Sequence, residues 1–389
     1  MSTQKQRAEF GREQLLFRSP MGDAAYFHNE SMIIEFAARR GVVSTSNLNG
    51  GYRTDLQYAF NHSCGRDLAI QQKRCPGLKG ANIQEHYAAI ACELGLPPDS
   101  TTGMGTAALI ENAAIARASH HGVEVMAVAT AGIDVNGGRA ADPAAYDEFE
   151  RRSLLLPAGT INVFLFINAR LDAGALTRAV MTATEAKTVA LDELMAPSMY
   201  SEGKATGSGT DSLIVICNDE SELVLYNTGK HVLLGEMIGV TVRDAVTEAL
   251  AKQTGMTPQR QASVEHQAKR YDLTKQAIIR YCQHAHPDAS VEQLEPVMEL
   301  LDRDPHVLAQ MASLVHLIDQ HRWGILPLEA LLEASQQALD HLLSSEGLAP
   351  LDLSRERKHR PAPNQPYYKT LLSDMRLCLA HLLYHRAYR

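Results

Sequence analysis

The stretch Gly-Thr-Ile-Asn-Val-Phe-Leu-Phe-Ile at residues 159–167 decides the fold. Its run of β-branched and aromatic apolar residues, bounded by Gly159, is typical of a buried strand. Thr160 stands where that strand begins, so a small hydroxyl is held at the start of a buried element. Such a hydroxyl is a candidate nucleophile, and the alternative interpretation is a β-branched residue that simply starts a strand.

A glycine-rich segment lies further along the chain. Residues 203–211 (GKATGSGTD) precede a second apolar run at 212–217. Glycine lets backbone N–H groups come close to a reacting carbonyl. The segment lacks the GxxxxGK[ST] order of a phosphate-binding loop. A strand that carries a nucleophile, followed by such a loop, favours an enzyme that cleaves an amide bond.

Composition narrows the class of protein. A chain of 389 residues with a formal net charge of −8 is long enough for two domains and too acidic for a whole-protein nucleic-acid footprint. The N-terminus has no apolar signal region and no stretch approaches twenty uncharged apolar residues, so we expect a soluble cytoplasmic protein without a membrane partner. Six scattered cysteines without CxxC pairs favour reduced thiols and no metal site.

Apolar periodicity predicts how the chain is organised. Strands are expected at 123–131, 160–167 and 212–217, and long helices at 173–194 and 232–251. After Lys252 the pattern is helical at 261–285, 291–302, 304–321, 327–345 and 367–386. We therefore predict three parts, which are an N-terminal extension at 1–30, a layered α/β catalytic domain at 31–252 and an all-α domain at 253–389.

Several ordered motifs resemble those of the adenosylcobinamide amidohydrolases, the CbiZ family. The resemblance is carried by STSNLNGG (44–51), TAA (106–108), TAG (130–132), GTINVFLFINA (159–169), ATEAK (183–187), ATGSGTD (205–211) and GKHVLLGEMIG (229–239). It implies cleavage of the amide between aminopropanol and the corrin propionate, which gives adenosylcobyric acid for cobamide salvage. No protein-bound cofactor is implied, because the cobalt arrives inside the corrinoid substrate.

A more distant resemblance links the same order of elements to DmpA-type aminopeptidases and ornithine acetyltransferases. Those are layered α/β sandwiches whose chain is cut before a Ser or Thr that becomes the N-terminal nucleophile. The resemblance implies that Thr160 would be exposed by cleavage at Gly159-Thr160 and that its α-amino group would act as the base. Self-cleavage is a separate hypothesis, and the sequence leaves it open.

Four residues are candidates for the chemistry. Thr160 is the nucleophile, and Asn136 can donate its amide N–H to the developing oxyanion. Ser208 and Asp211 can hydrogen-bond the nucleophile or the leaving amine. The alternatives are ordinary turn chemistry, since Asn favours turns and the Asp of a glycine-rich turn often satisfies its own backbone.

Further residues are candidates for substrate binding. Glu185 and Lys187 sit on the predicted helix that follows the nucleophile strand, and Lys230 and His231 precede the helix at 232–251, whose dipole favours a polar ligand group. A solvated helix face and helix capping explain the same residues. The remaining candidates are in the two glycine-rich segments: Asn47, Asn49, Gly50, Gly51, Gly207, Gly209 and Thr210.

Two other functions stay open. The same chemistry can act on another large amide ligand such as a siderophore. The loop at 65–82 and the helical addition are the segments that would determine a different substrate specificity. A ligand-binding protein that has lost catalysis is the second alternative, and the helical part can also be a lid or a homo-oligomer contact. Cys282, His284 and His286 lack a second cluster that would complete a metal site.

Overall fold

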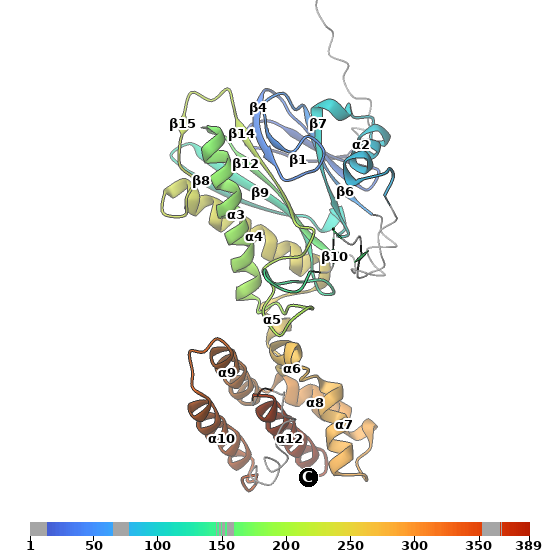
Figure 1. The fold of residues 1–389 in the computed structure, drawn as a ribbon, viewed down its shortest axis with the longest axis vertical. Helices are drawn as coiled ribbons and strands as arrows, with labels where there is room; N and C mark the ends of the chain where they lie inside the picture. Colours follow the sequence, from blue (N-terminus) through green and yellow to red (C-terminus); the bar gives the residue numbers. More distant parts are fainter. Residues whose placement is uncertain are drawn as a thin grey trace, which may run out of the picture. The chain divides into compact units, whose positions relative to one another are not determined.

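The computed structural model describes residues 14–64, 78–144, 146–147, 149, 152–153, 159–351, 366 and 368–389. The chain divides into two compact units, Met1–Thr257 and Pro258–Arg389. The first is a layered α/β structure and the second is helical, which confirms the predicted fold class. The described elements of each unit are shown in Figure 1.

Two mixed sheets form the centre of the first unit. The six-stranded sheet has the order β5-β4-β14-β12-β9-β8, and the five-stranded sheet has the order β1-β2-β3-β6-β7. The strands of the first sheet are β4 (Arg40–Ser44), β5 (Gly51–Arg53), β8 (Ala114–His120), β9 (Val123–Gly132), β12 (Thr160–Ile167) and β14 (Ser212–Asn218). Those of the second are β1 (Gln14–Arg18), β2 (Ala24–His28), β3 (Ser31–Glu35), β6 (Tyr58–Ser63) and β7 (Thr101–Thr106).

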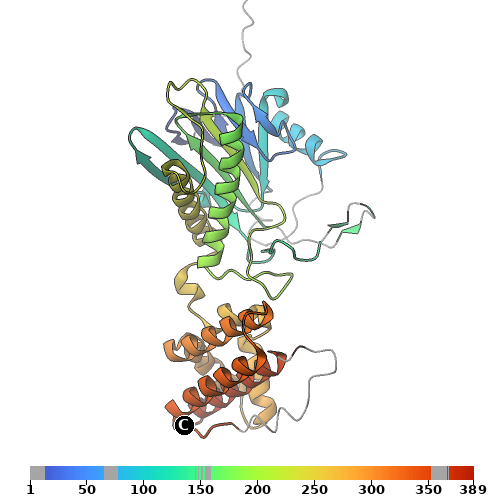
Figure 2. The ribbon, with the colours of Figure 1, turned by 60° about the vertical axis from the view of Figure 1, so that its left-hand side comes forward.

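The outer layers of this unit are helical. α3 (Ala173–Glu193) packs against β4 and β14, and α4 (Leu233–Thr254) packs against β8 and β9, so both lie on one face of the six-stranded sheet. α2 (Ile83–Glu93) lies on the outer face of the five-stranded sheet, against β7. Figure 2 shows the resulting order of helix layer, sheet, sheet and helix.

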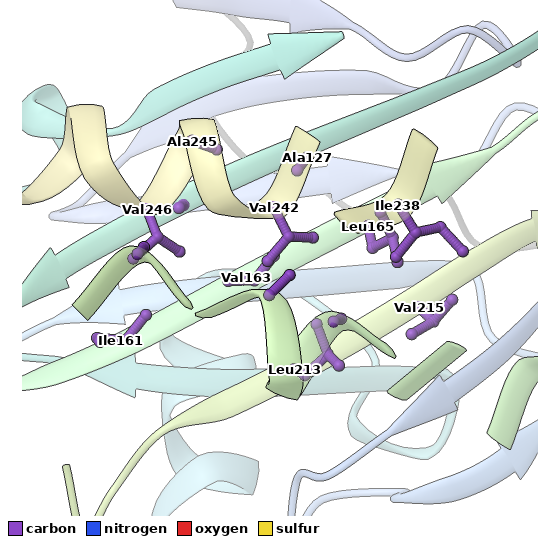
Figure 3. Packing of buried hydrophobic residues seen from close by; sticks show 14 of the residues in the cluster. Ala127, Ile161, Val163, Leu165, Leu213, Val215, Ile238, Val242, Ala245 and Val246 are labelled. Atoms are coloured by element: carbon purple, nitrogen blue, oxygen red, sulfur yellow. The ribbon is translucent and has the colours of Figure 1, made fainter. Parts of the chain in front are cut away.

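Strand β12 is buried on both faces. Ile161, Val163 and Leu165 point toward α3 and α4, where they meet residues of β14 and α4 (Figure 3). Phe164 and Phe166 point the other way, into the apolar core between the two sheets. β12 pairs antiparallel with β9 and parallel with β14, so neighbours on both sides fix its register.

Short elements complete the first unit. They are β10 (Tyr146–Asp147), β11 (Arg152–Ser153), β13 (Arg170–Leu171), β15 (Val224–Leu225), η1 (Pro98–Ser100) and η2 (Ile110–Asn112).

The second unit is built from helices only among its described residues. They are α5 (Pro258–Gln261), α6 (Val264–Ala268), η3 (Lys269–Tyr271), α7 (Lys275–Ala285), α8 (Val291–Arg303), α9 (Pro305–Arg322), α10 (Leu328–Ser345) and α12 (Tyr368–Ala387). They enclose an apolar core of their own. The single helix expected at 261–285 is in fact α6, η3 and α7, because Asp272 adopts a left-handed conformation between them with φ of 58°.

The N-terminal segment is more than an extension. Residues 14–30 were expected to lie outside the catalytic domain, yet β1 and β2 pair with β3 in the five-stranded sheet. The first unit also runs to Thr257, beyond the predicted boundary at 252, because α4 continues to Thr254 and ends at Gly255. The predicted loop at 65–82 lies largely outside the described residues, which resume at Leu78.

A buried ion pair ties this N-terminal segment to the six-stranded sheet. Arg40 on β4 and Asp23 before β2 are 2.8 Å apart, with side chains 2% and 0% exposed. Arg40 also donates to the carbonyl of Met21, and Asp23 accepts from the backbone N–H of Ala37. Every charge is matched, so the pair is tolerated in the interior.

We expect Asp23→Asn to lower the free energy of unfolding of the first unit by about 3–5 kcal/mol, because Arg40 would stay buried without a counter-charge. Urea denaturation measures the change. Asp55→Asn is the matched control, since the Arg53–Asp55 pair is 31% and 67% exposed and its loss is expected to cost less than about 1 kcal/mol. Equal effects of the two substitutions would contradict the role given to the buried pair.

Candidate active site

The site is built around the first residue of β12. The Thr160 side chain is buried, and its hydroxyl donates to the backbone carbonyl of Thr210 at 2.8 Å. A second acceptor, Asn162 Oδ1, lies 3.4 Å from the same hydroxyl. The backbone pairs with Gly132 of β9. The hydroxyl is therefore held in a fixed position at the point where the strand begins.

The carbonyl oxygen of Gly159, the residue before Thr160, accepts two hydrogen bonds. The amide Nδ2 of Asn136 lies 2.5 Å from the Gly159 oxygen, and the hydroxyl of Thr210 lies 3.0 Å from it. Two donors on one carbonyl oxygen are what an oxyanion hole requires, because they stabilise negative charge that develops there. Asn136 and Thr210 thus both donate to the Gly159 carbonyl, and the oxyanion role of Asn136 stays a prediction.

Glycine at position 159 is required by this contact. A Cβ atom there would lie 2.2 Å from Asn136 Oδ1 and 2.7 Å from the carbonyl oxygen of Gly132. The close approach of backbone to Asn136 is thus possible only without a side chain.

Asn136 is held in place by a turn at the end of β9. The backbone N–H groups of Asn136 and Gly137 both donate to the carbonyl of Ile133, and Gly138 pairs with Gly207 of the glycine-rich segment. The side chain is only 5% exposed, and its Oδ1 has no hydrogen-bond partner among the described residues. The turn that carries Asn136 is therefore hydrogen-bonded to the glycine-rich segment that carries Thr210.

Asp211 organises the glycine-rich segment. Its Oδ1 accepts from the backbone N–H of Ile161 at 2.9 Å and from the hydroxyl of Ser208 at 2.7 Å. Its Oδ2 pairs with Lys187 Nζ at 2.5 Å and accepts from the backbone N–H of Ser208. The contacts link α3, the glycine-rich segment and β12. Among the described residues, the Thr160 hydroxyl bonds to the Thr210 carbonyl and Asn162, and not to Asp211.

Glycine is also required beside this ion pair. A Cβ atom at Gly207 would lie 2.3 Å from Asp211 Oδ2 and 2.6 Å from Lys187 Nζ. The expectation that Lys187 would need a partner is met by Asp211. The contacts are those of the turn interpretation, since Asp211 accepts from Ser208 within its own turn and from the backbone of Ile161. A hydrogen bond from Asp211 to the nucleophile or the leaving amine stays a prediction.

A second carboxylate stabilises the loops beside the site. Burial acts to raise the pKa of Asp142, but hydrogen bonds from Ser198, Ser201 and the Arg139 backbone outweigh it, and the pKa lies below its ordinary value. The Ser198 hydroxyl is 2.6 Å from Asp142. The loop after β9 is thereby joined to the one after α3.

Four of the predicted residues form no hydrogen bond with the Thr160 side chain in the described part of the chain, and their substrate contacts stay predictions. Lys230 pairs with Glu185 at 2.6 Å, and both side chains are more than half exposed. His231 is exposed, and Val232, the residue before α4, provides no side-chain cap. The fourth, Asn49, is used in the loop, because its amide donates to the carbonyls of Pro98 and Thr101.

The turn after β4 nevertheless lies at the same end of the sheet as Thr160. Leu213 at the start of β14 exchanges hydrogen bonds with Thr45, and β14 separates β4 from β12. Asn47 and Gly50 are exposed there, and Gly51 adopts φ of 78°. Substrate contact by these residues stays a prediction.

Sequence reasoning missed three buried polar residues behind Thr160. Asn162 of β12, Asn61 of β6 and Thr130 of β9 are at most 2% exposed. Asn162 donates to Asn61 Oδ1 at 2.9 Å, and Asn61 donates to the Thr130 hydroxyl at 2.9 Å. The available signal was an Asn inside the apolar run of β12, since a buried amide needs partners.

Two further features concern other classes of protein. The described residues contain no group of three or more His, Cys, Asp or Glu side chains that could hold a metal ion. Of the helices in the described part, none is both long and apolar enough to cross a membrane.

A hydroxyl fixed beside a carbonyl that two donors grip, in a layered α/β unit, is an arrangement typical of amide hydrolases. Comparison with protein families places the chain among them, since the model for adenosylcobinamide amidohydrolase, CbiZ, matches residues 17–258. The chain belongs to this amidohydrolase family.

Individual relatives add further similarities. An uncharacterized protein of Methanocaldococcus jannaschii is 33% identical over 242 residues, which are 59% of this chain and 89% of that protein. A structure from Pyrococcus horikoshii is 12% identical with a TM-score of 0.28, and covers 62% of this chain and 82% of the other. The L-aminopeptidase D-Ala-esterase/amidase of Ochrobactrum anthropi, an Ntn hydrolase fold variant, is 11% identical with a TM-score of 0.28 over 62% and 81%.

We expect Gly159→Ala to lower the rate of amide hydrolysis by about 10²-fold, because the added methyl displaces the Asn136 amide from the carbonyl that it grips. Steady-state rates measure the effect. Gly239→Ala on α4 is the matched control, since a Cβ there meets nothing within 4 Å and Gly239 has no proposed part in the site. A Gly159→Ala protein as active as the wild type would show that the Asn136 contact has no part in catalysis.

Proposed function

We propose that this protein hydrolyses the amide between aminopropanol and the corrin propionate of adenosylcobinamide. The products are aminopropanol and adenosylcobyric acid, which serves cobamide salvage. The family match supports this substrate. The observation that carries the chemistry is the Gly159 carbonyl held by Asn136 and Thr210 beside the Thr160 hydroxyl.

Thr160 is the proposed nucleophile. Its Oγ attacks the amide carbonyl carbon, an Oγ–C bond forms, and the oxyanion is stabilised by Asn136 and Thr210. The C–N bond then breaks, and the hydroxyl proton passes through a base to the leaving amine. Water hydrolyses the resulting ester, which releases the carboxylate and restores the hydroxyl. Division into two steps lowers the barrier of a difficult hydrolysis.

The base in this proposal is the α-amino group of Thr160, which is free only after cleavage of the Gly159-Thr160 bond. The same geometry supports that cleavage. Thr160 Oγ attacks the Gly159 carbonyl carbon, the peptide C–N bond breaks, and an ester forms while the nitrogen gains a proton. Water then frees the Gly159 carboxylate. An α-amino group has a pKa near neutrality, so it can take the hydroxyl proton.

We expect the substrate to approach Thr160 from the side of the glycine-rich segment. Gly209 and Thr210 are exposed, whereas Thr160 behind them is buried. Lys187 and Asp211 neutralise each other next to it. A neutral amide is therefore the substrate group that the site suits, and the turn at 47–51 would contact more distant parts of the corrinoid. The cobalt belongs to the substrate.

Incubation of the purified protein with adenosylcobinamide, followed by mass spectrometry, tests the function. We expect aminopropanol and adenosylcobyric acid from the wild type, and a loss of at least about 10³-fold with Thr160→Ala, which lacks the nucleophile. Thr177→Ala is the control, because Thr177 is an exposed threonine on α3 that bonds only its own helix.

Three other results would each change the proposal. Equal turnover by wild type and Thr160→Ala would remove Thr160 from the mechanism. Hydrolysis of a different large amide, such as a siderophore, in a substrate panel would keep the chemistry and replace the substrate. Binding of adenosylcobinamide without turnover of any amide would favour a ligand-binding protein.

Intact-mass analysis of an active preparation tests the cleavage. We expect two fragments that meet at Gly159-Thr160, and a single full-length mass for Thr160→Ala, which cannot form the ester. A full-length mass in a wild-type preparation that hydrolyses its substrate would rule out cleavage as a condition of activity, and the base would have to be another group.

A further inference from the structure

We propose that Asn162 is a positioning residue for the Thr160 hydroxyl, and that Asn61 and Thr130 support it by hydrogen bonds. This inference rests on the proposed nucleophilic role of Thr160. The three residues come from β12, β6 and β9, and so span both sheets of the first unit. Nothing in the proposed reaction uses them directly.

The hydrogen bonds of Asn162 fix which of its atoms faces Thr160. Its Nδ2 donates to Asn61 Oδ1 at 2.9 Å and to the carbonyl of Gly105 at 2.8 Å. An amide nitrogen has two donors, so both are used. Asn162 therefore cannot act as an oxyanion donor, and its Oδ1 is directed at the Thr160 hydroxyl 3.4 Å away.

Asn61 is oriented in the same manner. Its Oδ1 accepts from Asn162, which turns its Nδ2 toward the Thr130 hydroxyl 2.9 Å away. Thr130 is the direct cross-strand neighbour of Asn162 in the β9–β12 register. The Gly105 carbonyl can only accept, so it fixes Asn162, and Asn162 fixes Asn61; reversal of either amide alone would bring two donors or two acceptors together.

These three polar residues lie in a largely apolar space between the two sheets. The space between the sheets is filled mostly by apolar side chains such as Met126, Phe164 and Ile214, and it also holds the Ser44–Thr102 hydroxyl pair. Buried polar groups are tolerated only when they are hydrogen-bonded, and apolar residues of similar size would avoid that requirement. The polar group behind Thr160 meets this requirement at each residue, and its hydrogen bonds lead from β6 and β9 to the candidate nucleophile.

Asn162 supplies what a nucleophilic hydroxyl needs before attack. Its proton must point to an acceptor so that a lone pair faces the carbonyl carbon. Two acceptors are available, the Thr210 carbonyl and Asn162 Oδ1. Thr210 is exposed on the glycine-rich segment, whereas Asn162 is 1% exposed. Asn162 is thus the acceptor on the rigid element, and it keeps the hydroxyl aimed when the substrate displaces contacts at Thr210.

The test measures kcat and KM for adenosylcobinamide hydrolysis. We expect Asn162→Ala to lower kcat by about 10–10²-fold with KM changed less than about twofold, because orientation and not substrate binding is lost. The loss should be larger in a Thr160→Ser background. Serine lacks the γ-methyl that restricts rotation, so its hydroxyl depends more on the acceptor.

Two more variants guard against a mere folding defect. Thr130→Val keeps the shape of the side chain and releases only the Asn61 amide, so we expect a smaller fall in kcat, of several-fold. Thr102→Val is the matched control, because Thr102 pairs with Ser44 by a buried 2.9 Å hydroxyl contact between the same two sheets and does not touch Thr160. Thermal unfolding of the wild type and every variant reports their stability.

A readout independent of the corrinoid separates this inference from the proposed function. The rate at which a β-lactone acylates Thr160, followed by mass spectrometry, should fall in Asn162→Ala as kcat does. Acylation that depends on Asn162, without hydrolysis of adenosylcobinamide, would support the positioning role and overturn the substrate. Full kcat and acylation in a folded Asn162→Ala protein, equal losses in the Thr160 and Thr160→Ser backgrounds, or no acylation of Thr160 in the wild type would overturn the inference.

Discussion

Burial of β12 on both faces is the constraint on which the rest of the first unit depends. All its residues are buried, and one face meets the helices while the other meets the second sheet. A shift of one residue would exchange these faces and move Thr160 and Asn162 from the sheet–sheet side to the helix side. Pairing with β9 and β14 prevents that shift. The hydroxyl of Thr160 is therefore positioned by the whole sandwich.

The candidate site connects β12 to two loops, the glycine-rich segment and the turn after β9. Strand pairing alone would not fix the position of either loop. Asp211 connects the glycine-rich segment to the backbone of Ile161 and to Lys187 on α3. Asn136 connects the turn after β9 to Gly159. Each loop thus contributes one donor to the same carbonyl oxygen, and both donors are tied back to β12. Preorganised donors cost no rearrangement when charge develops, which is the main source of oxyanion stabilisation.

Local patterns in the sequence were enough for some of this and not for the rest. Thr160, Asn136 and Asp211 were predicted because each stands at a strand start, a turn or a glycine-rich loop, where a few neighbouring residues reveal the structure. Asn61 meets Asn162 across two sheets, and no local pattern contains that pairing. Likewise β1 and β2 acquire their place only by pairing with β3.

The carbonyl that defines the site also limits when the site can act. In the intact chain the Gly159 oxygen occupies both donors, Asn136 Nδ2 and the Thr210 hydroxyl. A substrate carbonyl that used the same donors would have to displace a backbone group that is covalently bound to the nucleophile residue. Breaking the Gly159-Thr160 bond would free the donors and create the α-amine together. On the proposed mechanism, one geometry therefore serves first the chain's own amide and then that of the substrate.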